Sequence, residues 1–188
     1  MGRHMCFFNG HILDLGEVDE NALALLTAKT FASDHLFESE KKPNKYPFYT
    51  ATRHIIFQFP ASLQDHTVSN YTHFWPEWKE VVEPIIYQIT RQYDFKSGNT
   101  ARIMLANICP GGEIGLHIDQ NSAADVPHKI HVPIKTNELV EFIEEKSSYY
   151  LKRGSAYEVN NKIAHGVKNN SADDRIHLIF DYYDAASN

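Results

Sequence analysis

The chain has 188 residues, of which 43% are hydrophobic and 12% aromatic, which is enough for one domain with an apolar core and excludes wholesale disorder. Its 18 basic and 24 acidic residues give a formal charge of −6, which disfavours a nucleic-acid partner, because such proteins need a basic surface. No apolar run reaches the roughly 18 residues of a membrane span, and two cysteines cannot build a disulfide framework. We therefore expect a cytoplasmic protein with no membrane partner.

The expected domain organisation follows from a change along the chain, from helix-like hydrophobic spacing to short strand-like segments separated by turns. Residues 1–5 (MGRHM) lack the apolar segment of a signal peptide and look like the remnant of an expression tag. We expect residues 6–100 to supply helices and a strand that support a sheet. Residues 101–184 should form a β-rich catalytic core, and residues 185–188 a tail, all within a single domain.

The first half of the chain predicts two helices and one strand. Apolar residues recur at helical spacing in Glu17 to Ala32 and again in Phe74 to Tyr93, which is the longest helix candidate. The run HIIFQF at His54 to Phe59 predicts a strand. The polar stretch Glu38 to Pro47, which contains Lys41 to Lys45, is typical of a solvated loop, with a flap over a pocket as the sharper alternative.

The second half predicts eight short strands about ten residues apart, separated by turn-forming clusters. They are Ala101 to Ile108, Ile114 to Gln120, Lys129 to Thr136, Leu139 to Glu144, Ser148 to Lys152, Ala156 to Asn160, Ala164 to Lys168 and Arg175 to Tyr183. Helices followed by such a block indicate an α+β, mainly β, fold. We expect a jelly roll in which the helices cover the back of one sheet.

Three residues could bind a metal ion. His117 and Asp119 are two apart in a predicted strand, so their side chains share a face. Eleven His and 11 Asp in 188 residues would give roughly 0.6 such pairs by chance, so the pair alone is also compatible with a wet strand face. His165 lies in the short apolar strand AHGV, where an unpaired imidazole would be costly.

Basic side chains alternate with aliphatic ones in two further strands. Arg175 and His177 share one face of the last strand, and Lys129 and His131 share one face of another, while apolar residues occupy the opposite faces. Two imidazoles and a carboxylate form the facial triad that non-haem Fe(II) favours, with three positions open for an oxo-acid and dioxygen. Arg175, ten residues after His165 across an expected hairpin turn, would supply a fork for a carboxylate.

Four segments make a family resemblance specific. They are NICPGGEIGLHID (Asn107 to Asp119), HKIHVPIKTN (His128 to Asn137), GSAYEVNNKIAHGVKNNS (Gly154 to Ser171) and RIHLIFDYY (Arg175 to Tyr183). In order and spacing the catalytic half resembles the 2-oxoglutarate- and Fe(II)-dependent oxygenases, and among them the aspartyl/asparaginyl β-hydroxylase-like group. The first hundred residues show no such resemblance.

The resemblance implies a double-stranded β-helix that holds Fe(II) through His117, Asp119 and His165, with 2-oxoglutarate and O2 as co-substrates. It also implies that Arg175 binds the distal carboxylate of 2-oxoglutarate. Animal members of the group have glycine at the position of Asp119 and would bind iron through two histidines. This chain, in contrast, keeps the complete triad.

Two further residues, Lys129 and His131, are candidate 2-oxoglutarate contacts by the same resemblance. The family usually has arginine at the position of Lys129, and lysine keeps the charge but loses the bidentate fork. We therefore expect these two contacts to be weaker determinants than Arg175.

The expected reaction is hydroxylation of an unactivated C–H bond, with release of succinate and CO2. The substrate would be a peptide or protein side chain or a small amino-acid-like molecule. The alternatives are a cupin-like metal enzyme that does not use 2-oxoglutarate, which would not need Arg175, and a catalytically silent jelly-roll binding module. The substrate, the stereochemistry and the oligomeric state stay open at this point.

Overall fold

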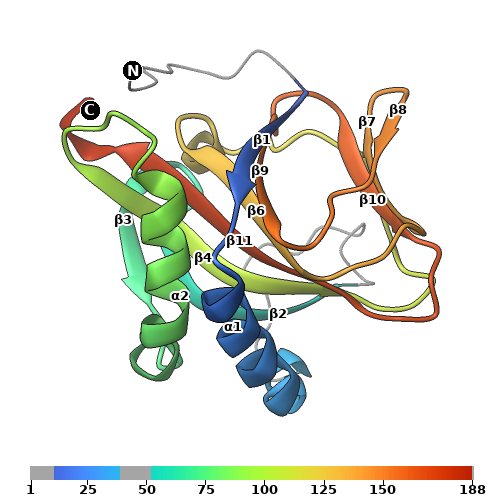
Figure 1. The fold of residues 1–188 in the computed structure, drawn as a ribbon. Coiled ribbons are helices and arrows are strands. Elements are labelled where there is room, and N and C mark those ends of the chain that lie inside the picture. The colour runs from blue at the N-terminus through green and yellow to red at the C-terminus, as the bar shows by residue number, and fades with distance from the viewer. Residues whose placement is uncertain (1–10, 39–51, 188) are drawn as a thin grey trace.

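Two antiparallel sheets dominate the computed structural model, which describes residues 11–38 and 52–187 (Figure 1). The larger sheet has seven strands, in the order β1 (Ile12–Glu17), β9 (Ser155–Val159), β6 (His128–Lys135), β11 (Arg175–Asp184), β4 (Gly98–Ile108), β2 (Thr52–Ser62) and β3 (Asp65–Tyr71). The smaller sheet has four, in the order β5 (Glu113–His117), β10 (His165–Asn169), β7 (Val140–Glu144) and β8 (Ser147–Tyr149).

All eight strands predicted for the second half are present, and they divide equally between the two sheets. Consecutive strands from β4 to β7 alternate between the sheets, as do β9, β10 and β11, so the chain winds back and forth across the gap. The hairpin expected between His165 and Arg175 is therefore wrong. β10 pairs with β5 and β7, whereas β11 pairs with β4 and β6, and the turn between them crosses from one sheet to the other.

Three strands from the first half extend the larger sheet. β2, which was expected, pairs with β4. β1 and β3 were not expected, because β3 is polar and mostly exposed and β1 depends on pairing with β9 across a bulge at Gly16. β5 is shorter than expected and ends at His117, which leaves Asp119 just beyond the strand.

Both predicted helices are present, as α1 (Glu20–Ala32) and α2 (Trp75–Thr90). α1 begins three residues later than expected, because Glu17 belongs to β1 and the side chain of Asp19 caps the helix by accepting a hydrogen bond from the Ala22 N–H (2.9 Å). Short 3-10 turns occur at Asp34–Glu38, Ser122–Ala124 and Ala185–Ser187. The loop expected around Lys41 to Lys45 lies outside the described residues.

The larger sheet has an apolar face and an opposite face, called the polar face below, on which charged residues and histidines stand among apolar side chains. Its apolar face packs against both helices, which lie side by side on that side of the sheet (Figure 1). Alternate residues of β6 and β11 supply this core: Ile130, Val132, Ile134, Ile176, Leu178 and Phe180. The opposite face turns toward the smaller sheet, and this arrangement confirms the expected jelly roll with helices behind one sheet.

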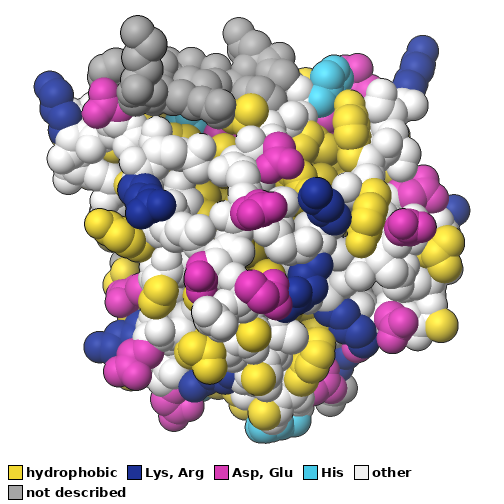
Figure 2. All heavy atoms as spheres, viewed as in Figure 1, with side chains coloured by type: hydrophobic (Ala, Val, Ile, Leu, Met, Phe, Trp, Pro, Cys, Tyr) yellow, Lys and Arg dark blue, Asp and Glu magenta, His cyan; other side chains and the backbone are white. Residues whose placement is uncertain are grey.

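The outer surface offers no broad basic region on the side seen in Figure 2, where acidic and basic side chains are interspersed over the described residues. Within residues 11–38 and 52–187, neither α1 nor α2 has the length and apolar character needed to cross a membrane.

Candidate metal and co-substrate site

The three predicted metal ligands meet at one end of the smaller sheet. His117 ends β5 and His165 begins β10, and the two residues are direct cross-strand partners whose ring centroids are 4.5 Å apart. Asp119 follows β5, and its Oδ1 lies 3.6 Å from Nε2 of His117. One ligand atom from each residue lies within 4.8 Å of the others, which suits coordination of a single ion.

Backbone contacts set the orientation of both imidazoles. Nδ1 of His117 lies 2.9 Å from the carbonyl oxygen of Gly115, and Nδ1 of His165 lies 3.0 Å from that of Ile163. Because a carbonyl can only accept, each Nδ1 carries the hydrogen, and each Nε2 keeps its lone pair for a metal. Burial lowers the pKa of His165, which favours the neutral ligand form. Two nitrogens and one carboxylate fit the donor set of Fe(II).

The backbone around the site also positions the ligands. The N–H of Asp119 donates to the carbonyl of Asn161 (3.2 Å), which holds the aspartate in place after β5 has ended. Gly166 follows His165, and a Cβ atom there would lie 2.7 Å from the carbonyl oxygen of Ile114. The absence of a side chain at Gly166 therefore permits the close approach of β5 to β10.

A cavity of about 690 Å³, including its open mouth, lies between the two sheets and contains the triad. The smaller sheet contributes Phe142 and Val167 as well as His117 and His165. The polar face of the larger sheet forms the opposite wall, with the following charged or histidine side chains: His54, Arg102, Lys129, His131 and Arg175.

Arg175 is the buried cation that the sequence predicts. It is 2% exposed, and no carboxylate of the described residues lies within ion-pair distance of it. Burial lowers its pKa to about 9, so it remains cationic at neutral pH. Burial, with Arg175 as the next cause, holds the pKa of His131 well below its usual value, so that imidazole is neutral. A buried, unpaired guanidinium is costly, and an anionic ligand would remove that cost.

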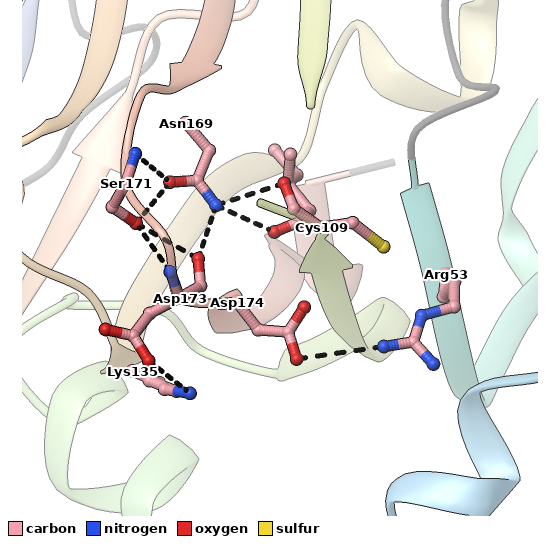
Figure 3. Close-up of polar contacts among 8 residues, drawn as sticks. Arg53, Cys109, Lys135, Asn169, Ser171, Asp173 and Asp174 are labelled. Carbon is pink, nitrogen blue, oxygen red and sulfur yellow. Dashed lines mark hydrogen bonds and ion pairs between the residues drawn. The ribbon is translucent and has the colours of Figure 1, made fainter. Parts of the chain in front are cut away.

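Polar contacts of Asn169 hold the turn between β10 and β11 (Figure 3), and Arg175 is the first residue of β11. The side-chain amide of Asn169 donates to the carbonyls of Ile108 and Cys109 (3.1 Å each) and to that of Asp173 (2.8 Å). Arg175 is the cross-strand partner of Ile108. The amide of Asn169 therefore joins the turn to the end of β4, next to Arg175.

Two ion pairs hold the outer side of the same turn. Nζ of Lys135 lies 3.3 Å from Oδ1 of Asp173, and Nη2 of Arg53 lies 3.8 Å from Oδ2 of Asp174 (Figure 3). These partly exposed pairs contribute little individually, and their effect here is to restrict the turn.

Lys129 lies in the cavity as predicted, but its ammonium group already has anionic partners. Its Nζ is 3.0 Å from Oδ1 of Asp181 and 3.3 Å from Oδ2 of Asp119. Burial would raise the pKa of Asp119, but Lys129 and His117 hold it well below its usual value, so the carboxylate is ionised. The contact of Lys129 with 2-oxoglutarate stays a prediction, as does that of His131.

The sequence analysis did not predict Arg102, which lines the cavity, or Asp181, which lies beside it. Arg102 on β4 and Asp181 on β11 are cross-strand partners, and Nη1 of Arg102 lies 3.3 Å from Oδ2 of Asp181. Both are charged residues within apolar strands, and Asp181 is in phase with Arg175. That signal could have found them. His177, on the same strand, is buried against His131 with ring centroids 5.7 Å apart.

Several solved oxygenases and hydroxylases share this fold. The viral collagen prolyl hydroxylase of Paramecium Bursaria Chlorella virus-1, in complex with 2-oxoglutarate, has a TM-score of 0.57 at 10% identity, covering 94% of this chain and 97% of that one. A prolyl-4-hydroxylase from Pseudomonas putida has a TM-score of 0.55 at 11% identity and 94% coverage of each chain. An oxidoreductase of the 2OG-Fe(II) oxygenase family from Burkholderia pseudomallei has 0.56 at 12% identity, covering 89% and 93%. At these identities the similarity concerns the fold.

Residues 56–185 match the model of the aspartyl/asparaginyl beta-hydroxylase family, and the chain belongs to that family. No curated protein matches it in a direct sequence comparison. The predicted family, the jelly-roll fold and the hydroxylase class are thereby confirmed.

Proposed function

We propose that this protein is an Fe(II)- and 2-oxoglutarate-dependent dioxygenase that hydroxylates an unactivated C–H bond and releases succinate and CO2. The substrate would be an amino-acid side chain of a peptide or protein, or a small amino-acid-like molecule. The observation that carries the proposal is the presence, in one cavity, of the His117, Asp119 and His165 cluster and of the buried Arg175, which has no carboxylate partner among residues 11–38 and 52–187.

The triad would hold the metal. His117 and His165 would bind through Nε2, since each Nδ1–H is engaged by a backbone carbonyl, and Asp119 would bind as an ionised carboxylate. Bound Fe(II) supplies the oxidative decarboxylation of 2-oxoglutarate by O2 and the oxidation of the substrate C–H bond.

The larger sheet would bind the co-substrate. Arg175 would donate two parallel hydrogen bonds to the distal carboxylate of 2-oxoglutarate, and His131 would present a neutral imidazole beside it. Apolar neighbours such as Phe142 and Ile108 would exclude water from this part of the cavity, which strengthens the ionic contact.

An anaerobic titration of the Fe(II)-loaded protein with 2-oxoglutarate tests the proposal. We expect a metal-to-ligand charge-transfer band in the visible spectrum, and slow succinate release when O2 is admitted. Arg175→Ala should need far more 2-oxoglutarate for the same band, and His165→Ala should not form it. If the wild type binds Fe(II) but shows neither the band nor succinate, the proposal is wrong. Oxygen consumption that does not depend on 2-oxoglutarate would instead favour a cupin-like enzyme.

A further inference from the structure

Arg102 is a second buried guanidinium in the cavity, at the opposite end of the larger sheet's wall from Arg175. On β4, the partner of Arg175 is Ile108, whereas Arg102 itself pairs with Asp181 of β11. The six residue steps from position 102 to position 108 of β4 correspond to roughly 20 Å along an extended strand. The backbones of the two arginines therefore lie far apart along this wall, which favours a separate ligand group for each guanidinium.

The hydrogen-bonding capacity of Arg102 is mostly unused. Its side chain is 4% exposed, and among the described residues neither Nε nor Nη2 has a hydrogen-bond partner. One face of the guanidinium lies over the ring of Phe59, 4.9 Å from its centroid. With one face covered and Nη1 beside Asp181, the remaining N–H groups are free to bind a ligand in the cavity that Arg102 lines.

The single negative charge of Asp181 is shared by two cations, because its carboxylate contacts both Arg102 and Lys129. Asp181 therefore does not fully neutralise Arg102. The charged residues of the site are Arg102, Lys129 and Arg175 against Asp119 and Asp181, a net charge of +1 while the histidines are neutral. A divalent metal and a doubly negative 2-oxoglutarate cancel each other. One positive charge then remains at the end of the cavity that holds Arg102.

Local backbone irregularities accompany Arg102. The pairing of β4 with β11 shifts between Asp181 and Tyr182, and the pairing of β4 with β2 shifts between Ile56 and Gln58. Such bulges increase the local twist and often re-aim a side chain next to a functional site. The wall between the two arginines is apolar on the same face and includes Met104 and Ile179.

We propose that Arg102 binds a carboxylate of the substrate, so that the enzyme acts on carboxylate-bearing amino acids or acidic side chains rather than on neutral or cationic ones. The substrate carboxylate would receive hydrogen bonds from Nε and Nη2 of Arg102, with its apolar part against Met104. This inference rests on the proposed function, and it assigns to Arg102 a specificity that the triad and Arg175 do not provide.

The test measures binding rather than turnover, by isothermal titration of Ni(II)-loaded, 2-oxoglutarate-saturated protein. One arm uses free L-amino acids and their C-terminal amides, which differ in the α-carboxylate. The other arm uses N-acetylated, C-amidated peptides containing aspartate, together with their asparagine counterparts. We expect the acid to bind at least tenfold more tightly than its neutral partner in one arm, and that arm identifies the source of the carboxylate.

Variants of Arg102 connect this preference to the residue. Arg102→Gln should weaken binding of the preferred acid by roughly 30-fold or more, and Arg102→Lys should recover part of the loss. Both should bind 2-oxoglutarate within about threefold of the wild type. Arg91→Gln, at an exposed position after α2, is the matched control and should change neither affinity.

The outcomes separate the two proposals. If 2-oxoglutarate does not bind the wild type, the proposed function fails. If 2-oxoglutarate binds but the acids bind no better than their neutral partners in both arms, the role of Arg102 is wrong. The same conclusion holds if Arg102→Gln and Arg102→Lys retain the preference of the wild type. The comparison of acid and neutral ligand in the wild type needs no variant, so it decides the question even if Arg102→Gln does not fold.

Discussion

The two sheets that enclose the cavity contribute different chemistry. The smaller sheet and the segment after β5 supply the candidate metal ligands His117, Asp119 and His165. The larger sheet supplies the buried cations Arg102, Lys129 and Arg175. The candidate metal site and the candidate site for organic anions thus lie on separate walls, and substitutions on one wall should leave ligand binding at the other largely unaffected.

The largest expected effect is on the smaller sheet. His165→Ala removes one of three protein ligands, and we expect Fe(II) affinity to fall by roughly 100-fold or more, since loss of supporting contacts alone commonly costs about 10- to 100-fold. Anaerobic metal titration measures this, and His73→Ala, at an exposed position before α2, is the control. Unchanged iron affinity in His165→Ala would remove β10 from the metal site.

The next effect is on the larger sheet. Arg175→Ala should weaken 2-oxoglutarate binding by about 30- to 1,000-fold, equivalent to about 2–5 kcal/mol, and leave the metal affinity nearly unchanged. Arg175→Lys should recover part of the loss because it keeps the charge. Titration with 2-oxoglutarate checks both variants. Affinities that agree within about threefold would show that the co-substrate carboxylate is anchored elsewhere.

Lys129 connects the two walls of the cavity, because it belongs to the larger sheet but contacts Asp119 of the candidate metal site. Lys129→Met leaves Asp181 with Arg102 alone and removes a cation from Asp119. Breaking a buried ion pair typically costs about 3–5 kcal/mol, so we expect a loss of unfolding free energy in that range. Urea denaturation measures it. A stability near that of the wild type, with a 2-oxoglutarate affinity at least tenfold lower, would instead make Lys129 a co-substrate ligand.

The smallest effect concerns Glu144, a fully buried residue of β7 opposite His165. Burial, with a contribution from Glu145, raises its pKa to about 7 from 4.5. The folded protein therefore keeps this proton to higher pH than the unfolded chain, and its contribution to stability declines as pH rises from about 4.5 to 7.

Glu144→Gln should remove that decline. We expect the metal-free variant to be more stable than the wild type at pH 8, by about 1–3 kcal/mol, and similar to it near pH 4.5. Denaturation curves at the two pH values test this. An equal difference at both would assign the effect of Glu144 to packing rather than to its ionisation.

Most of the fold followed from local patterns. Strand alternation and turn clusters predicted all eight strands of the jelly roll. In β6, for example, apolar residues toward the helices alternate with Lys129 and His131 toward the cavity, which gives the period of two. β1 and β3 escaped because their pairing depends on distant strands and their own sequences are largely polar or interrupted by Gly16. The turn after His165 was assigned to a hairpin because proximity in sequence does not reveal which sheet receives the next strand.

The site was predictable where residue type and spacing coincide, as for His117, Asp119, His165 and Arg175. Arg102 and Asp181 were not predicted. A charge within an apolar strand could have marked each residue, but it does not reveal that the two are partners until the strands are placed side by side. The structure likewise shows that Lys129 lies between two carboxylates, which no local pattern indicates.

The absence of a side chain at Gly166 affects the spacing of the two candidate histidine ligands. Both imidazoles are anchored to their own backbones, so the distance between their Nε2 atoms is set by the spacing of β5 and β10 more than by side-chain length. The methyl group of Gly166→Ala would clash with the carbonyl oxygen of Ile114 and push β5 and β10 apart. The size of the ion that the candidate site would accept should therefore depend in part on a residue that is not itself a ligand.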